Sequence, residues 1–315
     1  MTMIRDNTLN DICENMNIKS EEPTYTIFGE KQFLTKELIV FLILSMIISW
    51  PVVLLIITQL PPDFKTGDIE SFKNAVGSLT LLFGTGPMIS AIIVTMIYRG
   101  KSGLKELLWK VITWKVPVRW YFWALILPVI PQWIGLFFWA QLTDTELIRP
   151  TVTGYLSSWL QLALISAAYY ITEELGWRGF MLPRILSMHT WIKSSLLVGI
   201  IWSIWHYPLW IISSWATTGS LTQVVLIVTA FSVFATGTTI MVTWIFKNTR
   251  GSILLAMLLH GSSQANLTKM YAAAGDSSLL GSSFIIVVTV SLSVIVFLLL
   301  AVIRNQNRKS LNFVH

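Results

Sequence analysis

Eight apolar stretches of this chain are each long enough, or nearly so, to cross a lipid bilayer. A transmembrane helix needs about 20 predominantly apolar residues. Only 12% of the 315 residues are charged and 54% are hydrophobic, whereas a soluble domain usually carries about 25% charged residues. The sequence therefore predicts an all-α, polytopic membrane bundle of about eight transmembrane helices. The stretches are 38–58, 76–98, 119–141, 156–178, 195–215, 222–246, 251–268 and 281–303.

Between the second and third stretches, residues 99–119 alternate apolar side chains with cations at roughly helical spacing. This pattern is typical of an amphipathic helix that lies in the membrane interface, on an anionic leaflet. We therefore expect an interfacial helix here. Residues 1–35 are polar and acidic, so we expect a disordered cytosolic tail without a signal peptide. We expect residues 36–305 to form a single transmembrane domain, followed by a cytosolic tail over 306–315.

The cations are unevenly distributed over the predicted loops. With the N-terminus on the inner side, all of the 22 Lys and Arg residues fall on that side except Lys65, Lys73, Arg149 and Lys269. Cytoplasmic loops of membrane proteins carry an excess of Lys and Arg, so the distribution indicates a multi-pass cell-membrane protein with both termini in the cytosol. It also accounts for the net charge of +6 without a nucleic-acid partner.

Five ionisable residues interrupt the apolar stretches, and they come from three of them. Glu173, Glu174 and Arg178 belong to the fourth stretch, His206 to the fifth and His260 to the seventh. Ionisable groups inside a membrane are costly and usually functional. At 1.5 Å per residue, both histidines lie roughly 14–16 Å from the inner ends of their helices. All five residues can therefore meet in the cytosolic half of the bilayer.

The two adjacent glutamates cannot have the same role. Glu174 and Arg178 are spaced i, i+4, which lets them form an ion pair on one helix face. Glu173 is turned by about 100° around the helix and cannot share that partner. We therefore assign Glu174 to holding Arg178 and Glu173 to the cavity. Either histidine alone could simply hydrogen-bond a neighbouring helix, but two carboxylates and two histidines at similar depth favour a functional site.

Several kinds of chemistry use such a set of side chains. A carboxylate can take a proton from water, one histidine can orient that water, and a second can donate to a developing oxyanion. Cys13 lies in the tail, and Ser262 and Ser263 lack the context of a nucleophile elbow, so no Ser or Cys nucleophile is expected. One Glu and two His could instead hold Zn²⁺ with an open fourth position, although no HExxH motif is present. The residue pattern leaves both alternatives open, and the zinc ligands would be Glu173, His206 and His260.

Two short segments resemble motifs of a known family. The segment 173-EELGWR-178 resembles the EExxxR motif of the CPBP family, which comprises the type II prenyl-protein (CAAX) endopeptidases and their bacterial relatives, also called Abi proteins. The segment 202-WSIWH-206 is similar to the second family motif, FxxxH, with Trp202 in the aromatic position. The surrounding sequence resembles the bacterial branch of the family, and the resemblance covers about 155–268.

The third family motif, a His followed four residues later by Asn, is only partly present. His260 is followed by Gln264, and Asn266 stands two residues further on. Gln264 carries the same amide on a longer side chain and shares a helix face with His260. Asn266 is turned by about 240° from His260, so it faces largely away. Gln264 is therefore the better candidate for an amide donor.

The resemblance implies an eight-helix intramembrane glutamate protease with a cavity open to the cytosol. It implies Glu173 as the base, His206 as the group that orients water, and His260 with Gln264 or Asn266 as stabilisers of the oxyanion. Family members have been proposed to bind zinc; we expect no cofactor, with zinc as the alternative. Bacterial members are linked to bacteriocin immunity or to processing of exported peptides, and bacteria lack ordinary prenylated CAAX substrates, so the substrate does not carry over.

Two other classes of function remain open at this stage. A non-catalytic immunity or scaffold protein could keep the motifs without using them. A proton-coupled transporter could use buried charges as a relay, but here the charges cluster on one side of the membrane and the sequence has no inverted repeat. The expected partners are a peptide or membrane-protein substrate and membrane lipids, and the sequence leaves the oligomeric state open.

Overall fold

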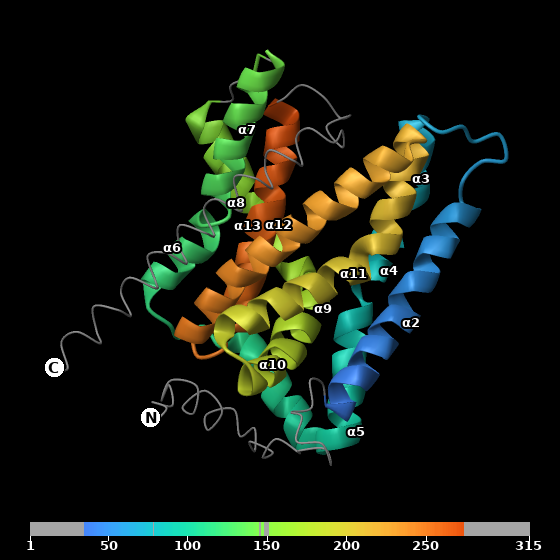
Figure 1. Ribbon diagram of the computed structural model, residues 1–315. Helices are drawn as coiled ribbons and strands as arrows, with labels where there is room; N and C mark the ends of the chain where they lie inside the picture. The colour runs from blue at the N-terminus through green and yellow to red at the C-terminus, as the bar shows by residue number, and fades with distance from the viewer. Residues whose placement is uncertain (1–34, 78, 145, 148–150, 274–315) are drawn as a thin grey trace, which may run out of the picture.

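The computed structural model describes residues 35–77, 79–144, 146–147 and 151–273, which form a bundle of helices (Figure 1). This confirms the predicted all-α fold class. Within the described residues, five helical segments are long and apolar enough to cross a membrane, which confirms a polytopic membrane protein. These segments are Lys36–Thr58, Leu79–Ile112, Val118–Thr143, Trp191–Thr218 and Leu221–Asn248.

The first apolar helix packs along a helix that begins at a glycine. A Cβ atom added to Gly86 would lie 2.0 Å from the Oγ of Ser49, so only glycine allows this close approach. Gly84 ends the preceding short helix, and Pro87 stands in the first turn of the next one. These residues thus break the second stretch for reasons of packing. The helices of this part are α2 (Lys36–Thr58), α3 (Ile69–Val76), α4 (Leu79–Gly84) and α5 (Gly86–Trp109).

The predicted interfacial helix is present over about half of residues 99–119. Gly100 has a φ of 61° and a ψ of −159°, so the second part of α5 turns away from the first (Figure 1). A 3-10 turn, η1 (Lys110–Ile112), follows α5. Residues 113–117 are not helical, and Pro117 is the N-cap residue of the next helix. The position of this segment in a membrane interface remains a prediction.

The predicted fourth span, 156–178, is helical but is not one regular α-helix. The chain instead forms α8 and α9, a seven-residue π-helical segment, η2, and then α10. A π-helix inserts an extra residue per turn, and such segments occur frequently at functional sites. Both glutamates stand at the point where α9 passes into η2. The bounds are α8 (Val152–Tyr169), α9 (Ile171–Glu174), η2 (Leu175–Met181) and α10 (Leu182–Met188).

The remaining apolar stretches form regular helices. A left-handed Gly219, with a φ of 62°, ends α11, and the Ser220 hydroxyl caps α12 by accepting from the Gln223 N–H. This tight turn lets α11 and α12 pack along each other, while α13 packs along α8. The predicted eighth span and the two tails lie outside the described residues, apart from Thr35. The other bounds are α6 (Val118–Ile126), α7 (Val129–Thr143), α11 (Trp191–Thr218), α12 (Leu221–Asn248) and α13 (Ile253–Ala273).

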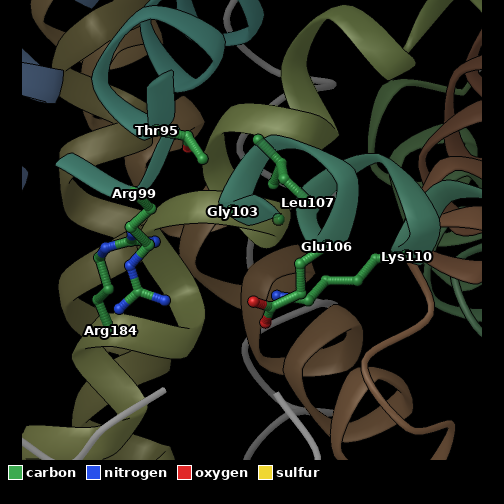
Figure 2. Close-up of a pocket in the computed structure, with 8 residues that line it drawn as sticks. Thr95, Arg99, Gly103, Glu106, Leu107, Lys110 and Arg184 are labelled. Carbon is green, nitrogen blue, oxygen red and sulfur yellow. The ribbon is translucent and has the colours of Figure 1, made fainter. Parts of the chain in front are cut away.

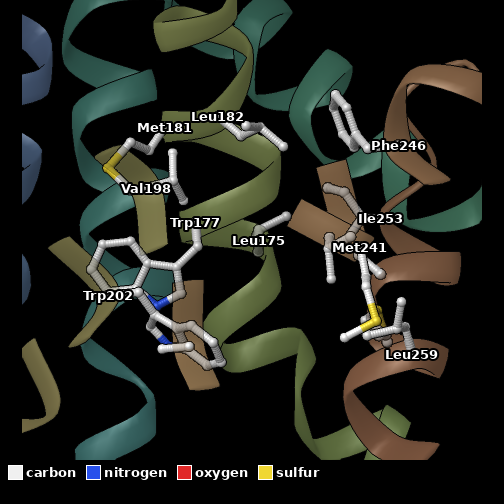
Figure 3. Packing of buried hydrophobic residues seen from close by; sticks show 14 of the residues in the cluster. Leu175, Trp177, Met181, Leu182, Val198, Trp202, Met241, Phe246, Ile253 and Leu259 are labelled. Carbon is white, nitrogen blue, oxygen red and sulfur yellow. The ribbon is translucent and has the colours of Figure 1, made fainter. Parts of the chain in front are cut away.

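The hydrophobic core surrounds η2. Leu175 and Trp177 of this segment are buried and pack in one cluster with Val198 of α11, Met241 of α12 and Leu259 of α13 (Figure 3). Side chains in a close-packed core have few alternative positions. The segment that carries the glutamates is therefore held on several sides by other helices.

Candidate functional site

Two glycines bring the glutamate segment close to its neighbours. A Cβ atom added to Gly176 would lie 2.5 Å from the Cβ of Pro87, and one added to Gly179 would lie 2.7 Å from a side chain at the start of α13. Larger residues at these positions would push η2 away from α5 and α13. The close approach shields the carboxylates that precede it, since Glu173 is 5% exposed and Glu174 is 0% exposed.

Glu174 is paired with residues from two elements. Its Oε1 accepts from Arg178 Nη1 at 2.8 Å and from His260 Nδ1 at 2.8 Å. The pair with Arg178 is the one that the i, i+4 spacing predicts. Arg178, itself fully buried, also donates from Nη2 to Thr239 Oγ1 at 3.1 Å, and its guanidinium lies 4.6 Å from the ring centroid of Trp202. The buried guanidinium is thus compensated on three sides.

Glu173 has a different partner, which comes from α11. Its Oε2 accepts from Trp202 Nε1 at 2.9 Å. Its other oxygen, Oε1, receives no hydrogen bond from the part of the chain that the structure describes. One oxygen of the carboxylate is therefore held in place, and the second is free to accept a proton or a hydrogen bond.

His206 is held by the backbone of its own helix. Its Nδ1 lies 3.0 Å from the carbonyl oxygen of Trp202. Because a carbonyl oxygen only accepts, Nδ1 carries the proton in this bond, and Nε2 of the neutral ring is an acceptor. The ring also packs against Trp205 and Phe231, with centroid distances of 4.5 and 4.8 Å. His206 therefore offers a fixed lone pair, as a group that orients water must do.

His260 is held between a carboxylate and two aromatic rings. Its ring stacks on Tyr170, with centroids 3.5 Å apart and planes 12° apart. It is nearly perpendicular to the Trp202 ring, at a centroid distance of 5.4 Å. Since Glu174 accepts from Nδ1, the other nitrogen, Nε2, is left for further chemistry. In the doubly protonated ring this nitrogen is a donor.

The structure does not assemble the alternative zinc ligands Glu173, His206 and His260. The Nδ1 atoms of His260 and His206 bond Glu174 and a carbonyl oxygen, so a metal could use only the Nε2 atom of each ring. Among the described residues, no group of three His, Cys, Asp or Glu side chains has an arrangement that could hold a metal ion. Glu173, His206 and His260 are therefore not gathered around one point, and the chemistry proposed below uses side chains alone. The expectation of no cofactor remains a prediction.

The two amide candidates lie in opposite environments. Gln264 is exposed on α13, and its side chain has no hydrogen-bond partner within the described residues. Asn266 is fully buried, where its Nδ2 donates to Gln132 Oε1 and its Oδ1 accepts from the Tyr155 hydroxyl. The amide of Asn266 is therefore already engaged between α7, α8 and α13, whereas the amide of Gln264 is free.

Trp202 is the site residue that the sequence identifies only as the aromatic position of a motif. Its indole N–H bonds Glu173, its carbonyl oxygen bonds His206, and its ring lies against Arg178 and His260. One feature of the sequence could have indicated this role of Trp202. A buried indole N–H usually has a hydrogen-bond partner, and Trp202 stands one helical turn before His206.

Comparisons with known proteins identify the same region. Residues 155–265 match a family model described as type II CAAX prenyl endopeptidase Rce1-like. This range contains six of the seven candidate site residues, and Asn266 lies one residue beyond it. Over 101 residues the chain is also 34% identical to the CAAX prenyl protease 2 of Methanococcus maripaludis. That alignment covers 32% of this chain and 36% of the relative, so the chain spans about a third of the length of the relative it matches.

Proposed function

We propose that the chain, whose residues 155–265 match the model of the type II CAAX prenyl endopeptidase Rce1-like family and which resembles a CAAX prenyl protease 2, is an intramembrane endopeptidase that uses a glutamate-activated water. One observation carries this proposal. Trp202 contacts Glu173, His206, Arg178 and His260 at once. A purely structural ion pair would require only Arg178 and Glu174, and it would not explain why Glu173 and His206 are also present.

In the proposed reaction, Glu173 is the general base. Its free Oε1 takes a proton from a water molecule, while the bond from Trp202 to Oε2 fixes the direction of the carboxylate. The Nε2 of His206 accepts the second water hydrogen and so aims the water oxygen at the scissile carbonyl carbon. As the new C–O bond forms, the electron pair of the C=O π bond moves to the carbonyl oxygen.

The resulting oxyanion is stabilised by hydrogen-bond donors from α13. Glu174 accepts from the Nδ1 of His260, and a proton on the Nε2 of the same ring makes this nitrogen a donor. In this form the Nε2–H of His260 donates to the oxyanion, and the free amide of Gln264 is the second donor. The oxyanion then collapses, the C–N bond breaks, and Glu173 gives its proton to the leaving amine.

This function is tested by peptide cleavage. The purified full-length protein, reconstituted in lipid vesicles, is incubated with a broad set of peptides beside its Glu173→Gln variant, and the products are read by mass spectrometry. We expect cleavage by the wild type alone, and no change on adding a chelator. Cleavage by neither protein would support the non-catalytic scaffold. Activity that a chelator removes and Zn²⁺ restores would support the zinc alternative.

The orientation in the membrane is a separate prediction. We propose that both termini and the 99–119 segment face the cytosol, because nearly all cations lie on that side. Single cysteines introduced into a Cys13→Ser background should react with an impermeant label from outside only in four loops. A cysteine at residue 110 should stay unlabelled in intact cells, and its labelling would reverse the orientation. The four loops are 59–75, 142–155, 216–221 and 269–280.

The amide donors can be separated by substitution. Loss of one oxyanion donor typically lowers kcat by about 10²–10³-fold, and we expect this for Gln264→Ala, with partial activity in Gln264→Asn. Asn266→Ala should affect kcat much less but should lower thermal stability, because Gln132 and Tyr155 lose a buried partner. Turnover of one peptide and the unfolding temperature are measured for each variant. An unchanged kcat in Gln264→Ala would leave His260 as the sole donor.

Trp202→Phe restores the residue of the family motif and removes one hydrogen bond. A hydrogen bond to a charged group contributes about 1.5–3 kcal/mol, so we expect kcat to fall about 10- to 100-fold with KM little changed. Trp177→Phe is the matched control, since Trp177 is also buried but its Nε1 has no hydrogen-bond partner among the residues that the structure describes. Equal losses of kcat in both variants would mean that lost packing, and not the bond to Glu173, is responsible.

A further inference from the structure

A recess outside the candidate site carries an unusual set of charges. It lies where the two parts of α5 and η1 meet η2 and α10, and it is open to the outside, so that its empty space of about 270 Å³ includes open solvent (Figure 2). Three cations, Arg99, Lys110 and Arg184, line it together with one carboxylate, Glu106. None of these groups takes part in the proposed reaction, so the recess calls for a separate explanation.

Arg184 is held in a fixed orientation at the wall of the recess. Its Nε donates to Glu37 Oε2 at 2.9 Å, its Nη1 donates to the carbonyl oxygen of Phe180 at 2.8 Å, and its guanidinium lies 3.6 Å from the Phe180 ring centroid. Burial lowers the pKa of Arg184 to about 10, so the guanidinium stays charged at neutral pH. Its Nη2 has no hydrogen-bond partner among the described residues. Arg184 therefore presents a partly desolvated cation with one open edge.

Arg99 lies beside it because of a glycine. A Cβ atom added to Gly103 would lie 2.3 Å from the Cβ of Arg99, so glycine makes room for this side chain. Figure 2 shows the guanidinium groups of Arg99 and Arg184 next to each other, and Lys110 reaching toward Glu106. Within the described part of the chain, Arg99 forms no ion pair. Two adjacent guanidinium groups repel each other, and an anion between them would remove this repulsion.

The charge and shape of the recess fit an anion with several acceptor oxygens. Three cations are opposed by two carboxylates, Glu106 in the lining and Glu37 on Arg184, which leaves an excess of positive charge. Guanidinium groups bind phosphate through paired hydrogen bonds. We propose that this recess binds a phosphate group held by Arg99, Arg184 and Lys110, and that the phosphate belongs to the headgroup of an anionic membrane lipid.

The assignment to a lipid comes from the side chains next to the recess. Trp109, Ile112 and Trp114 are 64%, 55% and 60% exposed, and they lie within four residues of Lys110 in the sequence. Exposed Trp side chains are typical of membrane interfaces, and basic pockets between helices bind anionic headgroups there. A soluble phosphate would contact only the cations, whereas the acyl chains of a lipid would also cover these apolar groups. The inference does not depend on the proposed protease activity.

The test is lipid binding by the purified full-length protein in detergent. The unfolding temperature is measured against increasing phosphatidylglycerol, phosphatidylcholine or inorganic phosphate, since a ligand of the folded state raises this temperature with concentration. We expect stabilisation by phosphatidylglycerol only. The double variant Arg99→Gln/Lys110→Gln should bind it about 10- to 30-fold more weakly, on the basis of about 1 kcal/mol per cation. Arg99→Gln alone serves if the double variant does not fold.

The matched control is Lys101→Gln/Lys105→Gln. Both lysines are exposed on the same part of α5 and do not line the recess, and the change in net charge is the same. We expect its affinity for phosphatidylglycerol to equal that of the wild type. An equal loss in both double variants would show general attraction to surface charge and overturn the site. An equal effect of inorganic phosphate would overturn the assignment to a lipid.

Discussion

Glu173→Gln should abolish peptide cleavage and leave the fold unchanged. The Gln side chain has the same size, and its carbonyl oxygen can still accept the hydrogen bond that Trp202 donates to Glu173. However, an amide cannot take a proton from water at the position of Oε1. A general base typically contributes about 10²–10⁴ in rate, so cleavage should fall toward the background. Initial rates on one peptide and the unfolding temperature are the two measurements.

The control for this substitution is Glu70→Gln. Glu70 is exposed in α3, so the same chemical change there should alter neither the rate nor the unfolding temperature. Glu173→Ala should also be inactive and close to the wild type in stability, because Glu173 forms no direct bond to a buried cation within the described part of the chain. Wild-type turnover in Glu173→Gln would show that another group activates the water.

The bundle could be predicted from the sequence because a run of about 20 apolar residues indicates a membrane-spanning helix. The interruption of the fourth stretch could not be predicted in this way. The extra residue per turn in η2 does not change the hydropathy of the segment. The need for glycine at position 176 can be recognised only when Pro87 is known to be its neighbour in space. Such features depend on which helices meet, and that information is not local.

The candidate site, too, could be predicted only where the interacting residues are close in the sequence. The pair of Glu174 and Arg178 could be predicted because both partners lie on one helix face, four residues apart. The bond between Glu174 and His260 joins residues 86 positions apart, and its existence depends on the rotation of α13 against η2. The sequence therefore identifies which ionisable groups are candidates, but it does not show that His260 bonds the second glutamate and Trp202 the first.

Glu174→Ala should destabilise the protein strongly, in contrast to Glu173→Ala. Arg178 is 0% exposed, and Glu174 is the carboxylate that accepts from its Nη1. Removing one partner of a buried ion pair costs about 3–5 kcal/mol because the remaining charge is uncompensated. For a chain of this size, we expect the unfolding temperature to fall by roughly 10 °C. Cleavage should fall too, since His260 loses the group that holds its Nδ1.

A second substitution separates stability from catalysis. Replacing both partners of a buried pair by apolar residues is often neutral or stabilising, so Glu174→Leu/Arg178→Leu should regain much of the unfolding temperature that Glu174→Ala loses. It should remain inactive, because His260 still lacks its carboxylate partner. Thermal unfolding in detergent and peptide turnover are measured on the same preparations. If Glu173→Ala were the unstable variant and Glu174→Ala the stable but inactive one, the roles assigned to the two glutamates would have to be exchanged.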